Sequence, residues 1–253
     1  MTQFYFSDLL AEEEMRGLLA QTRAGFESIL FSVADNLDDF DATLARERER
    51  QERFGHPPLS LHGPFLDLNP MAFDSYVRKA TMTRFNQAYE AAVALGAERV
   101  VFHSCMIPSV YFLQGWAERM VEFWLEFFEG KAGVQVCMEN VLDREAAPLA
   151  EVVREVARPD FGVCLDVGHA HCYSELSLDA WMDALGGVVS HVHLHDNDGS
   201  RDQHRGLGRG TIDWGHVIAR LSAENPTATW TVECANAAEA LESWRCWASL
   251  TAR

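Results

Sequence analysis

The chain alternates eight short runs of β-type residues with helical stretches along nearly all of its 253 residues. The expected strands are residues 3–7, 27–33, 59–63, 99–104, 134–140, 161–167, 189–196 and 229–234. Strands that alternate with helices indicate βα units and a parallel sheet. Eight such units predict an α/β fold of the (β/α)8 TIM-barrel type. An open, doubly wound sheet stays the alternative, because sequence alone does not show that a sheet closes.

The helical stretches between these runs differ in strength. Clear amphipathic patterns predict helices over residues 8–22, 74–95, 114–131 and 236–250, and weaker ones over 146–157, 177–185 and 214–223. Residues 43–53 form a run of charged side chains, which we interpret as a solvated helix face and not as a binding patch. No linker or change of composition divides the chain, so we expect one domain over residues 1–253.

The charge balance restricts the partners. Lys and Arg number 21 against 38 Asp and Glu, and a net charge of −17 repels a phosphate backbone at long range, so we expect no nucleic acid partner. The first residues show no signal-peptide pattern, and no apolar run approaches the ~20 residues that span a bilayer. Six scattered Cys without a C-x-x-C pair are typical of reduced thiols. We therefore expect a cytoplasmic protein without membrane contact, and a homo-oligomer stays open.

Metal-ligand side chains gather where six consecutive strands are expected to end. They are His62, His103, Glu139, Asp166, His193 and Glu233. The active site of a TIM barrel lies at the C-terminal ends of its strands, so all six would face one cavity. Each residue alone has an ordinary explanation as a packing, capping or solvated side chain. Together, the carboxylates would repel one another unless a cation lies between them, and carboxylates with imidazoles suit Mn, Zn, Co or Mg.

The two-residue repeat of a strand supports the same orientation. Small side chains stand two residues before four of the strand-end residues, and they are Val101, Cys137, Cys164 and Thr231. Residues two apart face the same side of a strand, so these side chains would line the barrel interior beneath the metal. His191, two residues before His193, is interpreted as a core or supporting histidine.

Two further segments offer ligands. His169 follows Asp166 by three residues and can reach the same cavity, whereas His171 has a weaker claim. Asp202 and His204 form a D-x-H pair whose side chains would point the same way in an extended loop.

Other residues of this second segment are interpreted as loop formers. Three are expected only to shape the turn, namely His195, Asp196 and Asp198. Three glycines would allow backbone amides to approach an anion, namely Gly206, Gly208 and Gly210. Arg205 and Arg209 would then bind the anionic part of a substrate, although a flexible loop explains the segment equally well.

Three parts of the sequence carry a family resemblance, and they are LDVGHAH, HVHLHDNDGSRDQHRGLGRGTIDW and the Glu of WTVEC. They resemble the xylose-isomerase-like TIM-barrel superfamily, which holds sugar and sugar-phosphate isomerases and epimerases together with endonuclease-IV-type apurinic endonucleases. The resemblance runs from His62 to Glu233. In the ketose 3-epimerases of this superfamily one metal is held on the last four strands, which implies the ligands Glu139, Asp166, His193 and Glu233. The same resemblance implies a substrate contact for His169.

The endonuclease-IV branch holds three zinc ions on nine positions, and the resemblance implies a ligand-type residue of this chain at each. They would be His62, His103 and Glu139 for one ion; Glu139, Asp166, His193 and Glu233 for the second; and His169, Asp202 and His204 for the third. Where that branch reads G-E-G in its loop, this chain has Gly208, Arg209 and Gly210. One to three divalent ions per chain are therefore expected.

We expect a divalent-metal-dependent isomerase or epimerase that acts on a sugar or sugar phosphate, a small carbohydrate, through a metal-stabilised enediolate. Glu139 and Glu233 would ligate the metal and also exchange a proton with carbon, while His169 would position a substrate oxygen. The alternative enzyme is a multinuclear metal phosphoesterase of the endonuclease-IV type. A barrel that binds a sugar or metal without turnover is the third interpretation.

Overall fold

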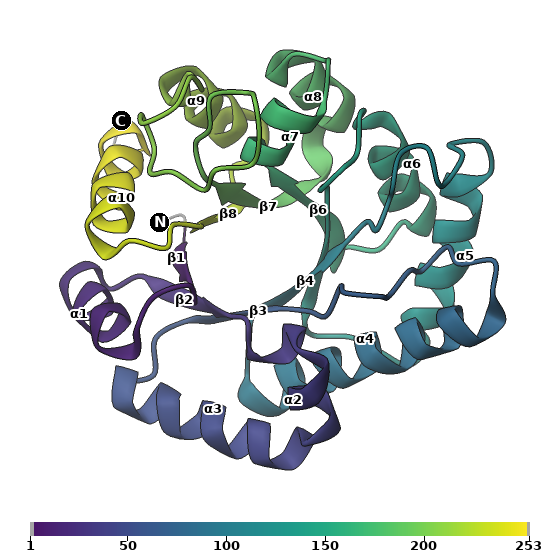
Figure 1. The fold of residues 1–253 in the computed structure, drawn as a ribbon, viewed down its shortest axis with the longest axis horizontal. Coiled ribbons are helices and arrows are strands. Elements are labelled where there is room, and N and C mark those ends of the chain that lie inside the picture. Colours follow the sequence, from purple (N-terminus) through teal and green to yellow (C-terminus); the bar gives the residue numbers. More distant parts are fainter. Residues whose placement is uncertain (1–2, 252–253) are drawn as a thin grey trace.

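Eight parallel strands form a closed barrel in which each strand pairs with its neighbours in the chain and β8 pairs with β1 (Figure 1). The computed structural model describes residues 3–251. The strands are β1 Phe4–Ser7, β2 Gly25–Ser28, β3 Leu59–His62, β4 Arg99–His103, β5 Gln135–Glu139, β6 Phe161–Asp166, β7 Val189–Leu194 and β8 Thr229–Val232. The predicted TIM barrel is confirmed, and closure between β1 and β8 rules out the open sheet.

Helices surround the barrel on its outside (Figure 1). They are α1 Glu12–Thr22, α2 Ala34–Asp38, α3 Phe40–Phe54, α4 Ser75–Leu95, α5 Trp116–Phe127, α6 Ala147–Val156, α7 Val167–Tyr173, α8 Leu178–Leu185, α9 Trp214–Glu224 and α10 Ala237–Thr251, with 3-10 turns at Leu30–Ser32 and Gly186–Val188. Among the described residues, no helix is both long enough and apolar enough to cross a membrane.

The second strand differs most from its prediction. It was expected over residues 27–33 but covers Gly25–Ser28, and Leu30–Ser32 form a 3-10 turn. The strand begins at Gly25 because its backbone lies against β1, where an added Cβ would come within 2.4 Å of the Tyr5 ring. Pairing with β1 and β3 therefore overrides the apolar composition of the following residues, and it places Glu27 inside the strand.

The charged run at residues 43–53 lies in α3 as expected, but the interpretation as a wholly solvated face is wrong for two residues. Glu47 is fully buried and Arg50 is nearly so. Arg50 donates to Asp8 at 2.6 Å and to Glu47 at 3.0 Å, so these charges pair where α3 meets the barrel. Burial raises the pKa of Glu47 to about 7, although the Arg50 guanidinium opposes this effect.

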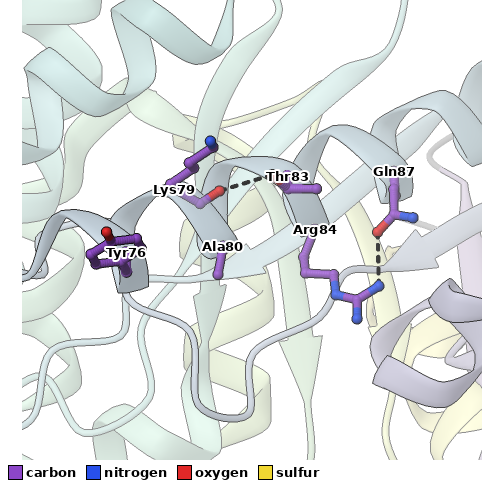
Figure 2. Close-up of a pocket in the computed structure, with 6 residues that line it drawn as sticks. All are labelled: Tyr76, Lys79, Ala80, Thr83, Arg84 and Gln87. Atoms are coloured by element: carbon purple, nitrogen blue, oxygen red, sulfur yellow. Dashed lines mark hydrogen bonds between the residues drawn. The ribbon is translucent and has the colours of Figure 1, made fainter.

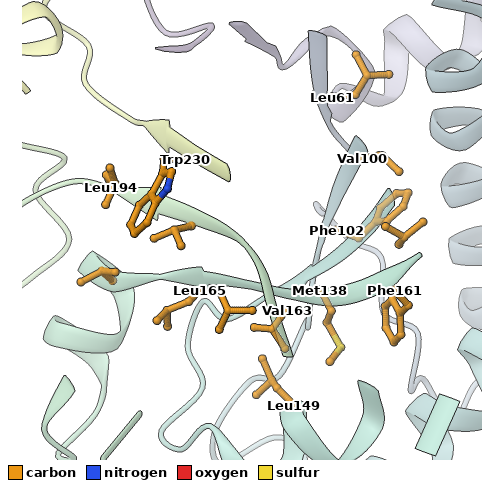
Figure 3. Close-up of a cluster of buried hydrophobic side chains, with 14 of the residues drawn as sticks. Leu61, Val100, Phe102, Met138, Leu149, Phe161, Val163, Leu165, Leu194 and Trp230 are labelled. Carbon is orange, nitrogen blue, oxygen red and sulfur yellow. The ribbon is translucent and has the colours of Figure 1, made fainter. Parts of the chain in front are cut away.

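The main hydrophobic layer lies between the strands and the surrounding helices. On β4, Val100 and Phe102 belong to this layer, and the Phe102 ring stacks on Phe85 of α4 with centroids 4.1 Å apart. Figure 3 shows outward-facing side chains from β3 to β8 gathered in the same layer. Burying these side chains orients each strand, because successive residues face opposite sides.

The barrel interior holds a separate, smaller cluster. Val101, Cys137 and Cys164 pack together there, which confirms the predicted inward layer. The structure contains six free cysteines and no disulfide among the described residues. Because Val101 faces inward, His103, two residues further along β4, faces the barrel mouth.

Candidate metal centre

Nine ligand-type side chains meet at the C-terminal mouth of the barrel. The residues that the structure brings together are His62, His103, Glu139, Asp166, His169, His193, Asp202, His204 and Glu233. Seven of them line a cavity of about 350 Å³, while Asp166 and His193 lie fully buried beside it. The strands supply most of these residues, and the loop after β7 supplies Asp202 and His204.

A second hollow in the molecule has a different character. It lies on the outer face of α4, among Tyr76, Lys79, Ala80, Thr83, Arg84 and Gln87 (Figure 2). No carboxylate or imidazole lines it. The metal-ligand side chains therefore line the cavity at the barrel mouth and not this hollow.

The first donor group combines His62, His103 and Glu139. Nε2 of His62 lies 3.2 Å from Nε2 of His103, and both nitrogens lie 3.4 Å from Oε2 of Glu139. Donor atoms at tetrahedral angles and about 2.0–2.2 Å from a zinc ion are about 3.3–3.6 Å from one another. The three atoms are therefore spaced as ligands of one ion would be.

The second donor group surrounds Nδ1 of His193. This atom lies 3.2 Å from Oε1 of Glu139, 3.3 Å from Oε1 of Glu233 and 3.9 Å from Oδ2 of Asp166. Glu139 thus directs one carboxylate oxygen to each of the first two groups. Asn140 supports this arrangement, because its side chain bonds to both the backbone N–H and the carbonyl of Asp166, at 2.9 Å each.

The third donor group combines His169, Asp202 and His204. Oδ2 of Asp202 lies 3.4 Å from Nε2 of His169 and 3.1 Å from Nε2 of His204. The two loop side chains meet as the D-x-H pattern predicted, but not through an extended loop. His204 has a φ of 44°, in the left-handed region that non-glycine residues rarely adopt, and such strain is common at functional sites.

Backbone carbonyls orient three of the ligand-type imidazoles. Nδ1 of His62 lies 2.9 Å from the carbonyl of Gly63, and Nδ1 of His169 lies 3.1 Å from that of Asn140. Nδ1 of His204 lies 3.3 Å from the carbonyl of Glu233. A carbonyl only accepts, so each Nδ1 carries a proton and each Nε2 faces the centre, as metal-ligating histidines require.

The electrostatics of the cluster balance carboxylates against imidazoles. Burial would raise the pKa of Glu139, but the imidazole of His193 outweighs it and holds this pKa well below its usual range. Burial would likewise lower the pKa of His169, yet the carboxylates of Asp166 and Asp202 raise it to about 10. Burial dominates at His103 and lowers its pKa to about 3. Most of the positive charge that offsets the carboxylates is therefore carried by histidines, which a divalent cation can replace.

Some carboxylate oxygens of the centre accept no hydrogen bond. Among the described residues, Oε2 of Glu139, Oδ2 of Asp166 and Oδ1 of Asp202 accept no hydrogen bond. A buried carboxylate oxygen without a donor is costly unless a cation lies beside it. The donor set and these oxygens therefore fit divalent ions.

His195 was expected only to shape a turn, but it lies beside the ligand-type residues. It is fully buried, with Nε2 3.1 Å from Oδ1 of Asp166 and Nδ1 3.5 Å from Oδ1 of Asp202. Its ring stacks on His204 with centroids 3.9 Å apart and an interplanar angle of 8°. Lone pairs lie in the ring plane, so two parallel stacked rings cannot both direct a nitrogen at one ion. At most one of these two rings can therefore join His169 and Asp202 on an ion, and all four residues bring a ligand-type atom within 4.8 Å of one another.

The neighbouring acidic residues shape the loop as expected. Asp196 is buried and accepts from the amides of Gly208 and Ile212 and from the Trp214 indole. Asp198 accepts hydrogen bonds from Ser200 and Gln203 nearby in the loop. These bonds hold the loop against the barrel. His171, whose claim was weaker, bonds to Thr211 at 2.9 Å and does not join the cluster.

The expected anion site around Arg205 and Arg209 is not supported by their placement. Arg205 lies 3.6 Å from Asp198, and Arg209 donates to Glu242 at 2.6 Å. Neither lines the cavity. The amide of Gly206 donates to Glu239, and that of Gly208 to Asp196, so neither is free for a bound anion.

One buried carboxylate beside the centre was missed by the sequence interpretation. Glu27 is fully buried in the barrel, with Oε1 3.0 Å from Nε2 of His193. The misplaced second strand hid it, because residue 27 was taken as the start of that strand and not as an interior position. The sequence did contain a signal for Glu27. In a strand that covers residues 25–28, an inward Gly25 implies an inward Glu27, because residues two apart face the same side.

The fold and site together define a TIM barrel with a candidate metal centre on the catalytic face of that fold. The chain belongs to the family of xylose isomerase-like TIM barrels, whose model matches residues 20–250. The TTHB071 protein from Thermus thermophilus, soaked with ZnCl2, is 26% identical, with a TM-score of 0.78 over 99% of this chain and 97% of that one. A D-tagatose 3-epimerase-like protein is 24% identical, with a TM-score of 0.80 over the same shares, and shows the fold.

Relatives were also found by sequence. The uncharacterized protein MJ1311 of Methanocaldococcus jannaschii is 28% identical to this chain. The matched segment covers 72% of this chain and 66% of that relative's length. A probable endonuclease 4 of Mycobacterium ulcerans is 26% identical to this chain. The matched segment covers 85% of this chain and 89% of that relative's length. The family resemblance predicted from the motifs is confirmed, and its structural neighbours include both sugar epimerases and endonuclease IV.

Proposed function

We propose that the protein is a divalent-metal-dependent isomerase or epimerase of a sugar, acting through an enediolate. The observation that carries the proposal is the pair of carboxylates Glu139 and Glu233, which approach Nδ1 of His193 from β5 and from the end of β8, at 3.2 and 3.3 Å. A bound divalent ion would supply Lewis-acid polarisation of a substrate carbonyl. Glu139, Asp166, His193 and Glu233 would hold that ion.

The two glutamates would also move the proton. A carboxylate beside the substrate can take a proton from the carbon next to the carbonyl, and its partner can return one. His169 would contact a substrate oxygen, because its Nε2 faces the cavity that it lines. Phe65, stacked on His103 at 4.3 Å, would help to exclude water from the reacting atoms.

The cavity favours a small, uncharged sugar over a sugar phosphate. Its volume of about 350 Å³ is near the lower end for small-molecule sites. Apolar side chains line its rim, namely Leu9, Ile29, Phe65 and Val141. No Lys or Arg of the described residues lines it, so a phosphate group would find no cationic side chain there.

Hydrogen exchange at carbon tests the proposal. We expect metal-loaded protein, incubated with a panel of ketoses in deuterated water, to place deuterium on the carbon next to the carbonyl. Glu139→Gln and Glu233→Gln should abolish this exchange, because an amide cannot accept the proton. Metal content must be measured for each variant, since loss of exchange with metal retained separates proton transfer from ligation. Absence of exchange across the panel would contradict the proposal.

A multinuclear metal phosphoesterase is the second candidate, and the three donor groups favour it. Nine donors are more than a one-metal isomerase needs, and Asp202 and His204 of the third group have no assigned role in isomerisation. Metals in such a centre would neutralise phosphate charge and activate water. His204→Ala separates the two candidates: a trinuclear hydrolase should lose most of its activity, whereas an isomerase should change chiefly in substrate binding. Hydrolysis of abasic DNA or a small phosphate ester, without deuterium exchange, would reverse the ranking.

A further inference from the structure

We propose that Glu27 is the positioning residue for His193, holding that imidazole so that Nδ1 faces the metal. The inference rests on the metal centre proposed above and adds a residue to it. Oε1 of Glu27 lies 3.0 Å from Nε2 of His193, and Glu27, His193 and Glu233 bring ligand-type atoms within 4.8 Å of one another. Nδ1 of His193 lies 3.2 Å from Glu139 and 3.3 Å from Glu233.

Glu27 is itself held in place from two other strands of the barrel. Its Oε2 accepts hydrogen bonds from Ser60 on β3 at 2.8 Å and from Thr231 on β8 at 3.2 Å. Ser60 and Thr231 are both fully buried. The carboxylate is therefore anchored through one oxygen, and the other oxygen is left facing His193.

Another neighbour of Glu27, His191, does not account for the burial of a charged carboxylate. His191 lies 3.3 Å from Oε2 of Glu27, but its two nitrogens already bond to Thr229 at 2.6 Å and Thr231 at 2.9 Å. Burying a charge in the barrel is costly unless it is paired. Oε1 of Glu27 and Nε2 of His193 lie 3.0 Å apart, and among the described residues neither atom has a hydrogen bond to any other group.

The other imidazoles of the centre are oriented differently from His193. Backbone carbonyls hold the far nitrogens of His62, His169 and His204. His193 instead has a carboxylate oxygen 3.0 Å from its far nitrogen. A carboxylate at that position orients the ring and makes the imidazole a better donor to a metal. The ion held by His193 should therefore be the tightest of those that the centre can bind.

Metal affinity tests this role without recourse to activity. We expect Glu27→Gln to weaken the binding of the first Co or Zn ion by about 10–100-fold, measured by competition with a chromophoric chelator. Ser60→Ala removes an anchor of Glu27 without changing its charge and should weaken binding less. Glu47→Gln is the matched control, because Glu47 is also fully buried but pairs with Arg50 at α3 and does not contact the centre.

The outcomes separate this inference from the proposed function. Wild-type protein that binds no divalent ion would overturn both. Wild-type binding that is lost in His193→Ala but unchanged in Glu27→Gln would overturn the role of Glu27 and leave the centre standing. Should Glu27→Gln fail to fold, the affinity of Ser60→Ala decides, and wild-type affinity in that variant overturns the inference.

Discussion

At the residue scale, the position of His195 depends on the glycine that it touches. Gly168 opens a space in α7, and a Cβ added there would lie 2.1 Å from Cε1 of His195. His195 is fully buried between Asp166 and Asp202, so it has no room to withdraw. We predict that Gly168→Ala lowers the free energy of unfolding by about 1–3 kcal/mol through overpacking, measured by urea denaturation.

The control for this change is a glycine in a helix with free space. Gly17 in α1 has no atom within 4 Å of an added Cβ. Gly17→Ala should therefore raise the free energy of unfolding by up to about 1 kcal/mol, because alanine is the better helix former. A Gly168→Ala protein as stable as the Gly17→Ala protein would show that the space around His195 is not constrained.

At the scale of elements, Asp166 joins β6 to α7 and serves two purposes. Its Oδ1 accepts from the amide of His169 at 2.6 Å, which caps α7, while Oδ2 faces the donor group around His193. We predict that Asp166→Asn weakens metal binding yet keeps the cap, because Asn caps helices as well as Asp does. Asp166→Ala should lose both and be about 1 kcal/mol less stable than Asp166→Asn.

Metal content by elemental analysis and unfolding by urea measure the two effects of these substitutions separately. If Asp166→Asn alone unfolded the metal-free protein, the residue would be structural and its assignment as a ligand would be wrong. Equal stability of the Asn and Ala variants would instead show that the cap contributes nothing to α7.

At the scale of the whole molecule, metal removal should lower stability. An ion that binds only the folded barrel contributes about 2.7 kcal/mol when its concentration is 100 times its dissociation constant. For a chain of this size that corresponds to a fall in Tm of about 5–10 °C on chelation, measured by calorimetry with and without chelator. An unchanged Tm, together with full deuterium exchange after exhaustive chelation, would remove the metal from the proposed function.

Much of the barrel and its centre was accessible from the sequence alone. Alternating strands and helices predicted the fold, and the two-residue repeat placed His103 above Val101 and Glu139 above Cys137. Both features depend only on residues that are close together in the chain, which is why they can be predicted from the sequence. The same local logic predicted that Asp202 and His204 act together.

The sequence by itself determined which side chains stand at the mouth of the barrel, because strand periodicity is a local property. The tertiary structure decided what those side chains contact. The position of Glu27 depends on the pairing of β2 with β1 and β3, and its contact with His193 joins strands that are far apart in the chain. Arg205 pairs with Asp198 in its own loop and Arg209 with Glu242 on α10, and neither arginine lines the cavity. Pairing across the barrel is a long-range property, and only the closed structure specifies it.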